Sequence, residues 1–363
     1  MTQTQERLAL LRQAMTAEQV DLVVLGPGAH MQWLLGFHPH ADERPSFVCI
    51  TADSAMMLMP ALNAEGSRDH TDLPMAEWSD DQGPESAFKR LLAETGAATA
   101  RKIVLDETMR ADFAALVTDH LPDATRIFTE TTVGALRMRK DEGEYALLKK
   151  NALMADAAMR TGWEHLKAGV REIEVAGAIQ ASFKAQGAQP LFSIVGAGRN
   201  GAFPHHATGQ TVIAEGQPVV MDIGGGSDGF SSDITRMAVI DTPPEGYDEV
   251  HAIVEASVQA AMQAARPGVQ AKAVDAAARQ VITDAGYGEF FVHRTGHGLG
   301  VEIHEPPYIT ATSDTVLEEG MVFSIEPGIY LPERFGIRLE DIVILRADGP
   351  EVFSELPRDL MRL

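Results

Sequence analysis

The sequence predicts two domains, an α/β domain followed by an α+β domain with an internal duplication. The 363 residues are 45% hydrophobic and 23% charged, a composition typical of folded globular proteins. In residues 1–132, helical patterns alternate with short apolar runs, which indicates α/β structure. In residues 133–363 the order changes to two helices, strands, two helices and strands again, which outlines a duplication.

Local periodicity predicts each element of the first domain. Apolar residues at helical spacing indicate helices, and short apolar runs bounded by polar turns indicate strands. The single cysteine, Cys49, lies in an apolar run, so we expect a buried thiol, and its count excludes a disulfide within the chain. The expected helices are 8–20, 85–94 and 110–120, and the expected strands are 21–25, 47–51, 55–59 and 102–105.

The domain boundary is placed where a basic stretch, 133–140, precedes the acidic run 141–144, because acidic residues suit the positive end of a helix dipole. In the second domain, β-branched and large apolar residues mark the strands. The expected helices are 141–166, 172–186, 247–265 and 271–285, and the expected strands are 219–223, 234–240, 321–326 and 337–345.

The formal net charge of −22, from 52 acidic and 30 basic residues, argues against a nucleic-acid partner, because phosphate binding needs Lys and Arg. Residues 1–19 contain no apolar core of the signal-peptide type, and no run is long enough to cross a bilayer. We therefore expect a cytoplasmic protein without a membrane partner.

Asp222 lies near the end of an apolar strand and is followed by a glycine-rich turn and Asp233. If the turn is centred between Ser227 and Asp228, the two carboxylates face each other across a hairpin. Like charges side by side are costly unless one is protonated or a cation lies between them, which favours a metal ion. A solvated turn rich in glycine and aspartate explains the same residues.

Three histidines, His293, His297 and His304, fall within twelve residues. Imidazole is the commonest metal ligand and titrates near neutral pH, so this group predicts a site. The glycines between the histidines argue against a zinc-binding helix and favour a loop whose backbone passes close to a ligand. Surface histidines, or core histidines with satisfied hydrogen bonds, are the alternative.

Glu326 and Glu340 lie in apolar strands, where a carboxylate must be paired, protonated or metal-bound. Arg338, predicted on the same strand face as Glu340, could hold a ligating carboxylate in place, although an Arg–Glu pair on an exposed strand has the same pattern. Four carboxylates and an imidazole without a thiolate suit Mn, Co, Zn or Fe, with manganese placed first. Two such ions about 3.5–4 Å apart can generate hydroxide from a shared water.

These residues resemble the metal-ligand set of the pita-bread metallopeptidases, which include methionine aminopeptidase, aminopeptidase P and prolidase. The motifs MDIGG, SDITR, HRTGHGLG, HEPP, SIEPGIY and GIRLEDIVIL are similar to those of the proline-specific branch. The likeness spans 137–345, and residues 1–132 loosely resemble the creatinase-like amino-terminal domain of these relatives. The resemblance implies a pita-bread catalytic domain at 133–363, hydrolysis of the Xaa-Pro bond at the N-terminus of peptides, and a homodimer.

The resemblance also implies roles for single residues. Glu326 would serve as the base that accepts the proton of the bridging water. His205, His293 and His304 match histidines that hold the scissile carbonyl and stabilise the oxyanion, whereas His206 has no counterpart. The implied ligands are Asp222 on one ion, Asp233 and Glu340 bridging both, and His297 and Glu326 completing the set.

One departure concerns the length of the substrate. Some dipeptidase relatives bind the free carboxylate of Xaa-Pro with an arginine between the metal-binding histidine and the first metal-binding glutamate. Here 298–325 contains no Lys or Arg, which leaves Arg199 and Arg334 as weak candidates. We therefore expect an aminopeptidase acting on Xaa-Pro peptides of variable length, with a strict Xaa-Pro dipeptidase as the alternative. Another amide hydrolase, a lyase or a metal-free peptide-binding module on the same scaffold are further alternatives.

Overall fold

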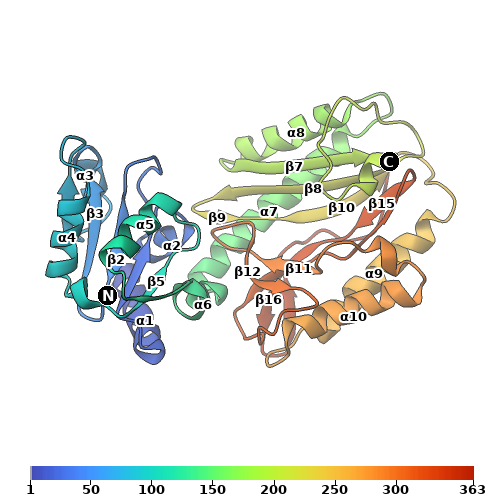
Figure 1. Cartoon of the computed structure of the whole chain (residues 1–363). Coiled ribbons are helices and arrows are strands. Elements are labelled where there is room, and N and C mark those ends of the chain that lie inside the picture. The colour runs from blue at the N-terminus through green and yellow to red at the C-terminus, as the bar shows by residue number, and fades with distance from the viewer. Residues whose placement is uncertain (1) are drawn as a thin grey trace. The chain divides into compact units, whose positions relative to one another are not determined.

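The computed structural model describes residues 2–363, which form two compact units (Figure 1). The first unit ends at Arg137 and the second covers Met138–Leu363. The boundary expected between residues 132 and 133 falls at the start of helix α6 (Val133–Met138) and stays a prediction. Within residues 2–363, no helix is both long enough and apolar enough to cross a membrane.

The first unit contains one mixed sheet of six strands. Its strands are β1 (Leu22–Leu25), β2 (Phe47–Ile50), β3 (Ala55–Pro60), β4 (Met75–Trp78), β5 (Lys102–Leu105) and β6 (Thr125–Ile127), and its helices are α1 (Gln3–Glu18), α2 (Ala29–Leu35), α3 (Ala61–Arg68), α4 (Glu85–Glu94), α5 (Ala111–His120) and α6. The strand order is β4-β3-β2-β1-β5-β6, with β1 parallel to β5 and antiparallel to β2. Phe88 of α4 and Phe113 of α5 pack in one core with Cys49, whose predicted burial is confirmed.

The second unit repeats the order of two helices followed by strands. Its helices are α7 (Glu142–His165), α8 (Glu172–Ala185), α9 (Tyr247–Ala264) and α10 (Ala271–Asp284). Its strands are β7 (Gln189–Ala197), β8 (Pro218–Ser227), β9 (Phe230–Ser231), β10 (Ile234–Val239), β11 (Gly296–Gly298), β12 (Glu305–Ile309), β13 (Val322–Ile325), β14 (Gly328–Leu331), β15 (Phe335–Arg338), β16 (Asp341–Arg346), β17 (Gly349–Val352) and β18 (Met361–Arg362). This order confirms the predicted internal duplication.

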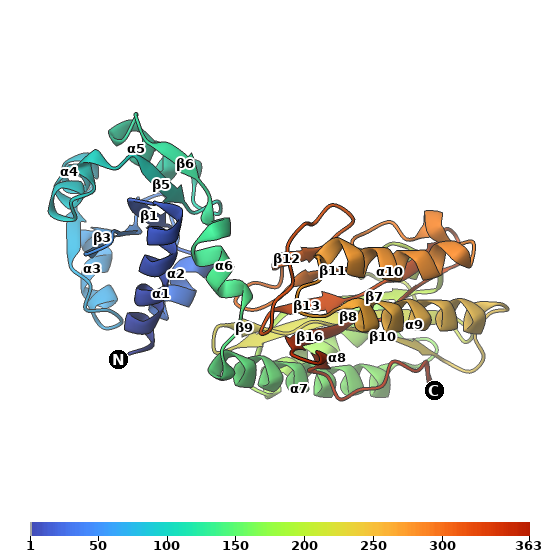
Figure 2. The same ribbon diagram turned by 90° about the horizontal axis from the view of Figure 1, so that it is seen from below.

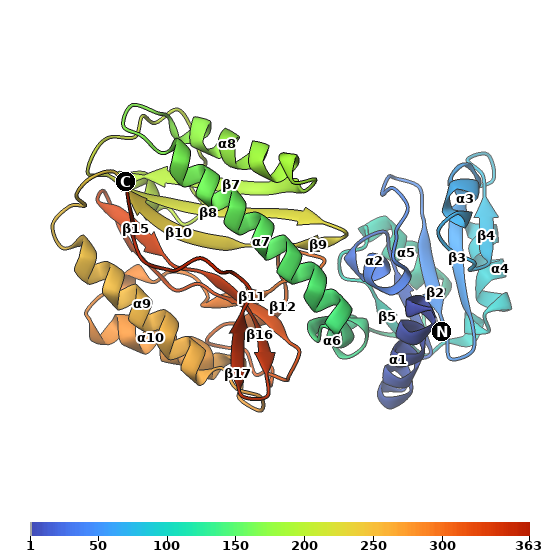
Figure 3. The ribbon, with the colours of Figure 1, turned by 180° about the vertical axis from the view of Figure 1, so that it is seen from behind.

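Each helix pair packs with strands of its own repeat. The first sheet has the order β18-β10-β8-β7, and α7 runs beside α8 along it (Figure 3). The second sheet has the order β12-β11-β13-β16-β17, and β14 pairs with β15 in a separate hairpin. Helices α9 and α10 lie side by side (Figure 2) and share a hydrophobic core with β13 and β15. The mixed α/β fold class expected from the sequence is confirmed.

The start of α7 follows from its sequence. The Asp141 carboxylate accepts a hydrogen bond from the backbone N–H of Glu144 at 2.8 Å, and the Glu144 carboxylate accepts one from the backbone N–H of Asp141 at 3.1 Å. This reciprocal arrangement satisfies two N–H groups that have no partner within the helix. The acidic run predicted to begin a helix therefore does so.

The hairpin that carries the two aspartates differs from the predicted register. Its turn residues are Asp228 and Gly229, which have φ angles of 53° and 79°, as a type I′ turn requires. The turn is therefore centred one residue later than expected, and Asp222 pairs with Thr235 rather than with Asp233. Asp233, two residues before Thr235, is a diagonal neighbour of Asp222.

The segment expected to form one strand over 337–345 is divided in two. Strand β15 ends at Arg338 and β16 begins at Asp341. Between them, Glu340 forms an isolated antiparallel bridge with Thr235. The prediction of one uninterrupted strand is therefore wrong, but Arg338 and Glu340 still lie on the same side, since both side chains contact the hydroxyl of Thr235.

His297 lies in a strand, so the predicted loop at this position is also wrong. Strand β11 runs between β12 and β13. A Cβ at Gly296 would lie 1.9 Å from the carbonyl oxygen of Ser324, and one at Gly298 would lie 2.2 Å from that of Pro306. The glycines beside His297 are therefore required by the close approach of neighbouring backbone.

We expect Gly296→Ala to lower the free energy of unfolding by about 1–3 kcal/mol, because the added methyl group forces backbone apart. Gly177→Ala in α8 is the matched control. A Cβ there would meet no atom within 4 Å, so the gain in helix propensity should stabilise the protein by about 0.5–1 kcal/mol. Urea unfolding of both variants measures the difference. A Gly296→Ala protein as stable as the wild type would contradict the close approach.

Candidate metal centre

The second unit brings all the site residues expected from the sequence to one cavity of about 760 Å³. Asp222 lies in β8 and His297 in β11, while Glu326 directly follows β13. Asp233 directly precedes β10, and Glu340 lies between β15 and β16. Both repeats therefore contribute. The residues that line the cavity include Asp222, Asp233, His297, Glu326, Glu340, His205, His293, His304 and Arg338.

His297 directs one ring nitrogen toward the carboxylates. Its Nδ1 donates to the carbonyl oxygen of Gly298 at 3.1 Å, which leaves Nε2 as the atom that faces the cluster. Nε2 lies 3.2 Å from Oε1 of Glu326 and 3.8 Å from Oδ2 of Asp233. Asp233, His297 and Glu340 each place one potential ligand atom within 4.8 Å of the others. A histidine whose second nitrogen is held by a backbone carbonyl is typical of metal sites.

Three carboxylate oxygens in the cluster have no hydrogen-bond partner among residues 2–363. They are Oδ1 of Asp222, Oδ1 of Asp233 and Oε1 of Glu340. The three residues are only 8%, 8% and 1% exposed. An ionised oxygen that loses water without gaining a partner is strongly unfavourable, and a divalent cation is the partner that carboxylates accept most readily. The residues present therefore fit a metal ion.

The carboxylates also perturb one another. Burial, followed by the charges of Glu340, Asp222 and Glu326, raises the pKa of Asp233 well above its usual range. Burial, followed by the charges of Glu326 and Asp222, likewise raises the pKa of Glu340. Without a cation, protons at these two groups reduce the repulsion. A bound cation would displace those protons, so metal binding is linked to proton release.

Glu326 behaves differently from its neighbours. Burial alone would raise its pKa, but a hydrogen bond from His297 and the charges of His297 and His293 lower the pKa to about 2. The hydroxyl of Ser324 donates to Oε1 of Glu326 at 3.0 Å and accepts from the backbone N–H of His297 at 2.9 Å. Glu326 is therefore ionised at neutral pH, and Ser324 fixes its position relative to His297.

Supporting groups hold one oxygen of two of these carboxylates. Arg338 Nη2 donates to Oδ2 of Asp222 at 2.5 Å, and Arg338 Nε lies 3.2 Å from the hydroxyl of Thr235. The Thr235 hydroxyl in turn donates to Oε2 of Glu340 at 2.7 Å. Arg338 Nη1 donates to the hydroxyl of Tyr330 at 2.8 Å. The second oxygen of each carboxylate, Oδ1 of Asp222 and Oε1 of Glu340, is the one without a hydrogen-bond partner in the part of the chain that the structure describes.

The sequence analysis missed these supporting residues. Thr235 lies two residues after Asp233, and Ser324 two residues before Glu326. Alternation along a strand could have indicated both, because residues two apart share a face. Tyr330 closes the SIEPGIY motif, but its contact with Arg338 had no local signal, since it forms through the pairing of β14 with β15.

Two of the predicted substrate-side histidines are uncharged at neutral pH. His293 Nδ1 donates to the carbonyl of Arg294 at 2.7 Å, and its Nε2 lies 2.7 Å from the hydroxyl of Tyr330. Burial raises the pKa of Tyr330 to about 12 and lowers the pKa of His293. The ring of His304 lies 4.1 Å from that of His297. Burial and then the charges of His297 and Arg294 lower the pKa of His304 to about 4.

His205 and His206 are adjacent in sequence but have different surroundings. His205 lines the cavity together with Pro204. His206 Nε2 lies 2.9 Å from Oε2 of Glu172, a fully buried carboxylate. This contact gives His206 a structural partner outside the lining of the cavity.

The arginines expected as weak candidates for binding a substrate carboxylate lie elsewhere. Arg199 is exposed and pairs with Glu333, and within the described chain the cavity lining includes neither Arg199 nor Arg334. It does include Arg294, whose guanidinium carbon lies 4.8 Å from the centre of the Tyr308 ring. No carboxylate of residues 2–363 forms an ion pair with Arg294. Sequence analysis did not single out this residue.

The chain is similar to known proteins along nearly its whole length. Residues 146–347 match the model of metallopeptidase family M24, and residues 7–139 match that of the creatinase/prolidase N-terminal domain. The chain is 36% identical over 362 residues to a probable dipeptidase, PepE, of Mycobacterium tuberculosis, covering 98% of this chain and 95% of the relative. It is 32% identical over 358 residues to the Xaa-Pro dipeptidase of Pyrococcus furiosus, covering 98% and 99%. The crystal structure of a recombinant prolidase from Thermococcus sibiricus superimposes with a TM-score of 0.92 at 32% identity, covering 100% of both chains.

The raised pKa values of Asp233 and Glu340 predict how pH affects the metal-free protein. The unfolded chain releases these protons near pH 4 (about 3.9 for Asp and 4.3 for Glu), whereas the folded protein retains them to higher pH. Their contribution to stability is therefore greatest below about pH 4 and is lost as pH rises through the folded pKa values.

Asp233→Asn removes one of these charges. At pH 8 and without metal, we expect the variant to be more stable than the wild type by an amount on the order of 1–3 kcal/mol, and the difference should shrink toward pH 5. Saturating metal should reverse the order, because a metal at 100 times its Kd stabilises the wild type by about 2.7 kcal/mol. Thermal unfolding of both proteins with EDTA measures the order of stability without metal, and thermal unfolding with Mn²⁺ measures the order with metal. An equal rise in Tm for both proteins would contradict the assignment of Asp233.

Proposed function

The chain belongs to metallopeptidase family M24, and we propose that it hydrolyses the bond between an N-terminal residue and proline. The observation that carries the proposal is the set of three buried carboxylate oxygens without partners, directly beside His297 and Glu326 in one cavity. The named relatives are dipeptidases that include an Xaa-Pro dipeptidase and a prolidase. The proposed metal ligands are Asp222, Asp233, His297, Glu326 and Glu340, holding two divalent ions with manganese as the first candidate.

When bound, such ions supply a nucleophile from water near neutral pH and polarise the scissile carbonyl. The protein must then move a proton to the leaving group, which is the secondary amine of proline. Glu326 is assigned this role because it lies in the cavity beside His297, where its carboxylate is ionised at neutral pH, and because Ser324 holds it in place. General acid–base catalysis by a positioned carboxylate is the chemistry that this step needs.

His205, His293 and His304 are proposed to hold the scissile carbonyl and the developing oxyanion. The lowered pKa values of His293 and His304 leave both rings uncharged, so they can orient the substrate without adding repulsion beside the metal ions. Both ring nitrogens of His293 are engaged, by Tyr330 and by the carbonyl of Arg294, so His205 and His304 would be the donors to the oxyanion and His293 would position the substrate. Donors that are already oriented stabilise the transition state more effectively than water does.

We propose a short substrate on the basis of Arg294, whereas the aminopeptidase was expected first. Arg294 stacks on Tyr308 and has no ion pair with a carboxylate of residues 2–363, so its guanidinium is available to the C-terminal carboxylate of an Xaa-Pro dipeptide. Arg338, the other arginine of the cavity lining, is engaged with Asp222 and Tyr330. We therefore favour dipeptidase activity over cleavage of longer peptides. A cytoplasmic location and a homodimer stay predictions.

Removal of metal tests the proposed function. Dialysis against a chelator should abolish hydrolysis of Ala-Pro, and Mn²⁺, Co²⁺ or Zn²⁺ added separately should restore it to different extents, because all three suit this donor set. Full activity of the chelated enzyme would contradict the proposal that hydrolysis depends on metal ions. If other amides are hydrolysed while Ala-Pro resists every metal, only the specificity for proline is wrong, and the alternative amide hydrolase is then favoured.

The role of Arg294 is tested by substrate length. In Arg294→Ala, kcat/KM for Ala-Pro should fall by about 10–100-fold, the loss of a charged hydrogen bond, while the value for Ala-Pro-Ala amide should change little. Arg294→Lys keeps the charge and should recover part of the loss. Arg199→Ala, a change at an exposed residue, is the matched control. Equal losses for both substrates would argue against a carboxylate contact.

A further inference from the structure

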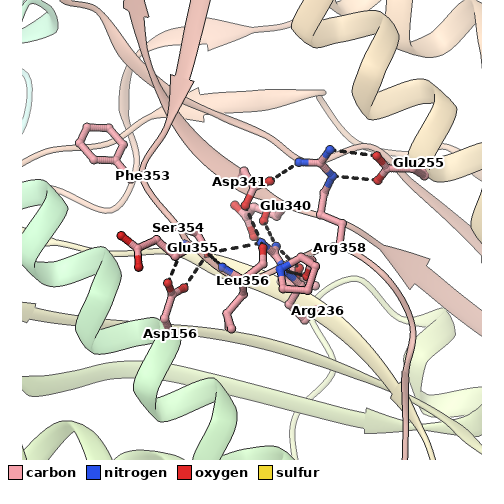
Figure 4. Close-up of polar contacts among 12 residues, drawn as sticks. Asp156, Arg236, Glu255, Glu340, Asp341, Phe353, Ser354, Glu355, Leu356 and Arg358 are labelled. Atoms are coloured by element: carbon pink, nitrogen blue, oxygen red, sulfur yellow. Dashed lines mark hydrogen bonds and ion pairs between the residues drawn. The ribbon is translucent and has the colours of Figure 1, made fainter.

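A fully buried arginine lies behind the break that carries Glu340 (Figure 4). Arg236 Nη1 donates to the carbonyl oxygen of Glu340 at 2.5 Å and to that of Thr235 at 3.0 Å. Its Nη2 donates to Oδ1 of Asp341 at 2.7 Å. The guanidinium therefore holds the main chain of Glu340 itself and the side chain of the next residue.

The other N–H groups of Arg236 reach a segment far along the chain. Nε donates to the carbonyl of Pro357 and Nη2 to that of Leu356, both at 2.8 Å. Four carbonyls and one carboxylate thus satisfy all five N–H groups of the guanidinium. A lysine has only three N–H donors and no planar fork, so it cannot reproduce this pattern.

The distant segment is itself fixed to α7. Oδ1 of Asp156 accepts from the hydroxyl of Ser354 at 2.6 Å, and Oδ2 accepts from the backbone N–H of Glu355 at 2.7 Å. Figure 4 shows this contact on the opposite side of the segment from Arg358. The segment whose carbonyls accept hydrogen bonds from Arg236 is therefore also held by Asp156 of α7.

Arg358 fixes the same segment to α9. It forms two hydrogen bonds with Glu255, at 2.8 and 2.9 Å, and donates to Oδ2 of Asp341 at 2.5 Å. Both arginines therefore share Asp341, but only Arg236 contacts Glu340 (Figure 4). This difference provides a matched pair of residues for an experiment.

We propose that Arg236 is a positioning residue that sets the metal affinity of the centre through Glu340. The hydroxyl of Thr235 holds one carboxylate oxygen of Glu340, and Arg236 holds its main-chain carbonyl. The direction of the remaining oxygen, Oε1, is fixed by these two contacts. Loss of the hydrogen bond from Arg236 to the carbonyl oxygen of Glu340 would let the Glu340 side chain turn away from the other ligands. The inference rests on the proposed metal site.

Metal affinity measured by calorimetry on the full chain tests the proposal. In Arg236→Lys, we expect Mn²⁺ to bind about 10–100-fold more weakly, as is usual when a partner of a metal ligand is lost. The visible absorption of the Co²⁺-loaded protein should also change, because it reports coordination geometry. The control, Arg358→Gln, breaks the contacts with Glu255 and Asp341 but should bind Mn²⁺ as tightly as the wild type does.

A purely structural role for Arg236 predicts a different pattern. It would lower the Tm of the metal-free and the metal-loaded protein equally and leave the affinity and the Co²⁺ spectrum unchanged, and that result would overturn the proposal. So would equal weakening by Arg358→Gln. If Arg236→Lys does not fold, Asp341→Ala removes the carboxylate that accepts from Nη2 of Arg236 and should still weaken Mn²⁺ binding. Arg358→Gln already accounts for the lost contact with Arg358, so unchanged affinity in Asp341→Ala counts against the proposal. A wild type that binds no metal would instead remove the metal site, and this inference with it.

Discussion

Repulsion among buried carboxylates is the constraint on which the centre depends. Asp222, Asp233 and Glu340 each bury an oxygen that no group of the described chain satisfies, and Glu326 stays ionised beside them. Such an arrangement is tolerated only when protons or cations offset the charge. The surrounding structure holds the carboxylates together against this repulsion, since two sheets, two helix pairs and their apolar cores fix the backbone from which each one projects.

Much of the fold could be predicted because its elements have strong local patterns. Helix α4 and strand β5 have the expected bounds, since amphipathic spacing and an apolar run mark them. Other elements contradict local rules. Strand β12 contains two prolines and β11 two glycines, residues that normally argue against a strand. The break at Glu340 carries neither glycine nor proline, so only its pairing with Thr235 reveals it. The Asp228-Gly229 pair did carry the correct turn signal.

Short sequence motifs identify the candidate ligands of the site, but they do not identify the residues that orient those ligands. Acids and histidines in unusual apolar or glycine-rich settings could be recognised from sequence, and the family resemblance that they suggested is confirmed by matches along nearly the whole chain. The groups that orient those side chains come from other segments. Tyr330 approaches Arg338 across a hairpin, and Arg236 approaches Leu356 across the second unit. Contacts of this kind depend on tertiary packing, which one sequence does not encode in any short pattern. The individual roles of the ligands stay predictions.

The partners of Arg236 also impose an order of events during biosynthesis. Leu356 lies 120 residues after Arg236 and Pro357 lies 121 after it. At a translation rate of about 5–20 residues per second, the guanidinium is made on the order of ten seconds before these acceptors exist. A nascent chain that does not yet include Leu356 and Pro357 therefore lacks two of the acceptors that hold the guanidinium behind Glu340.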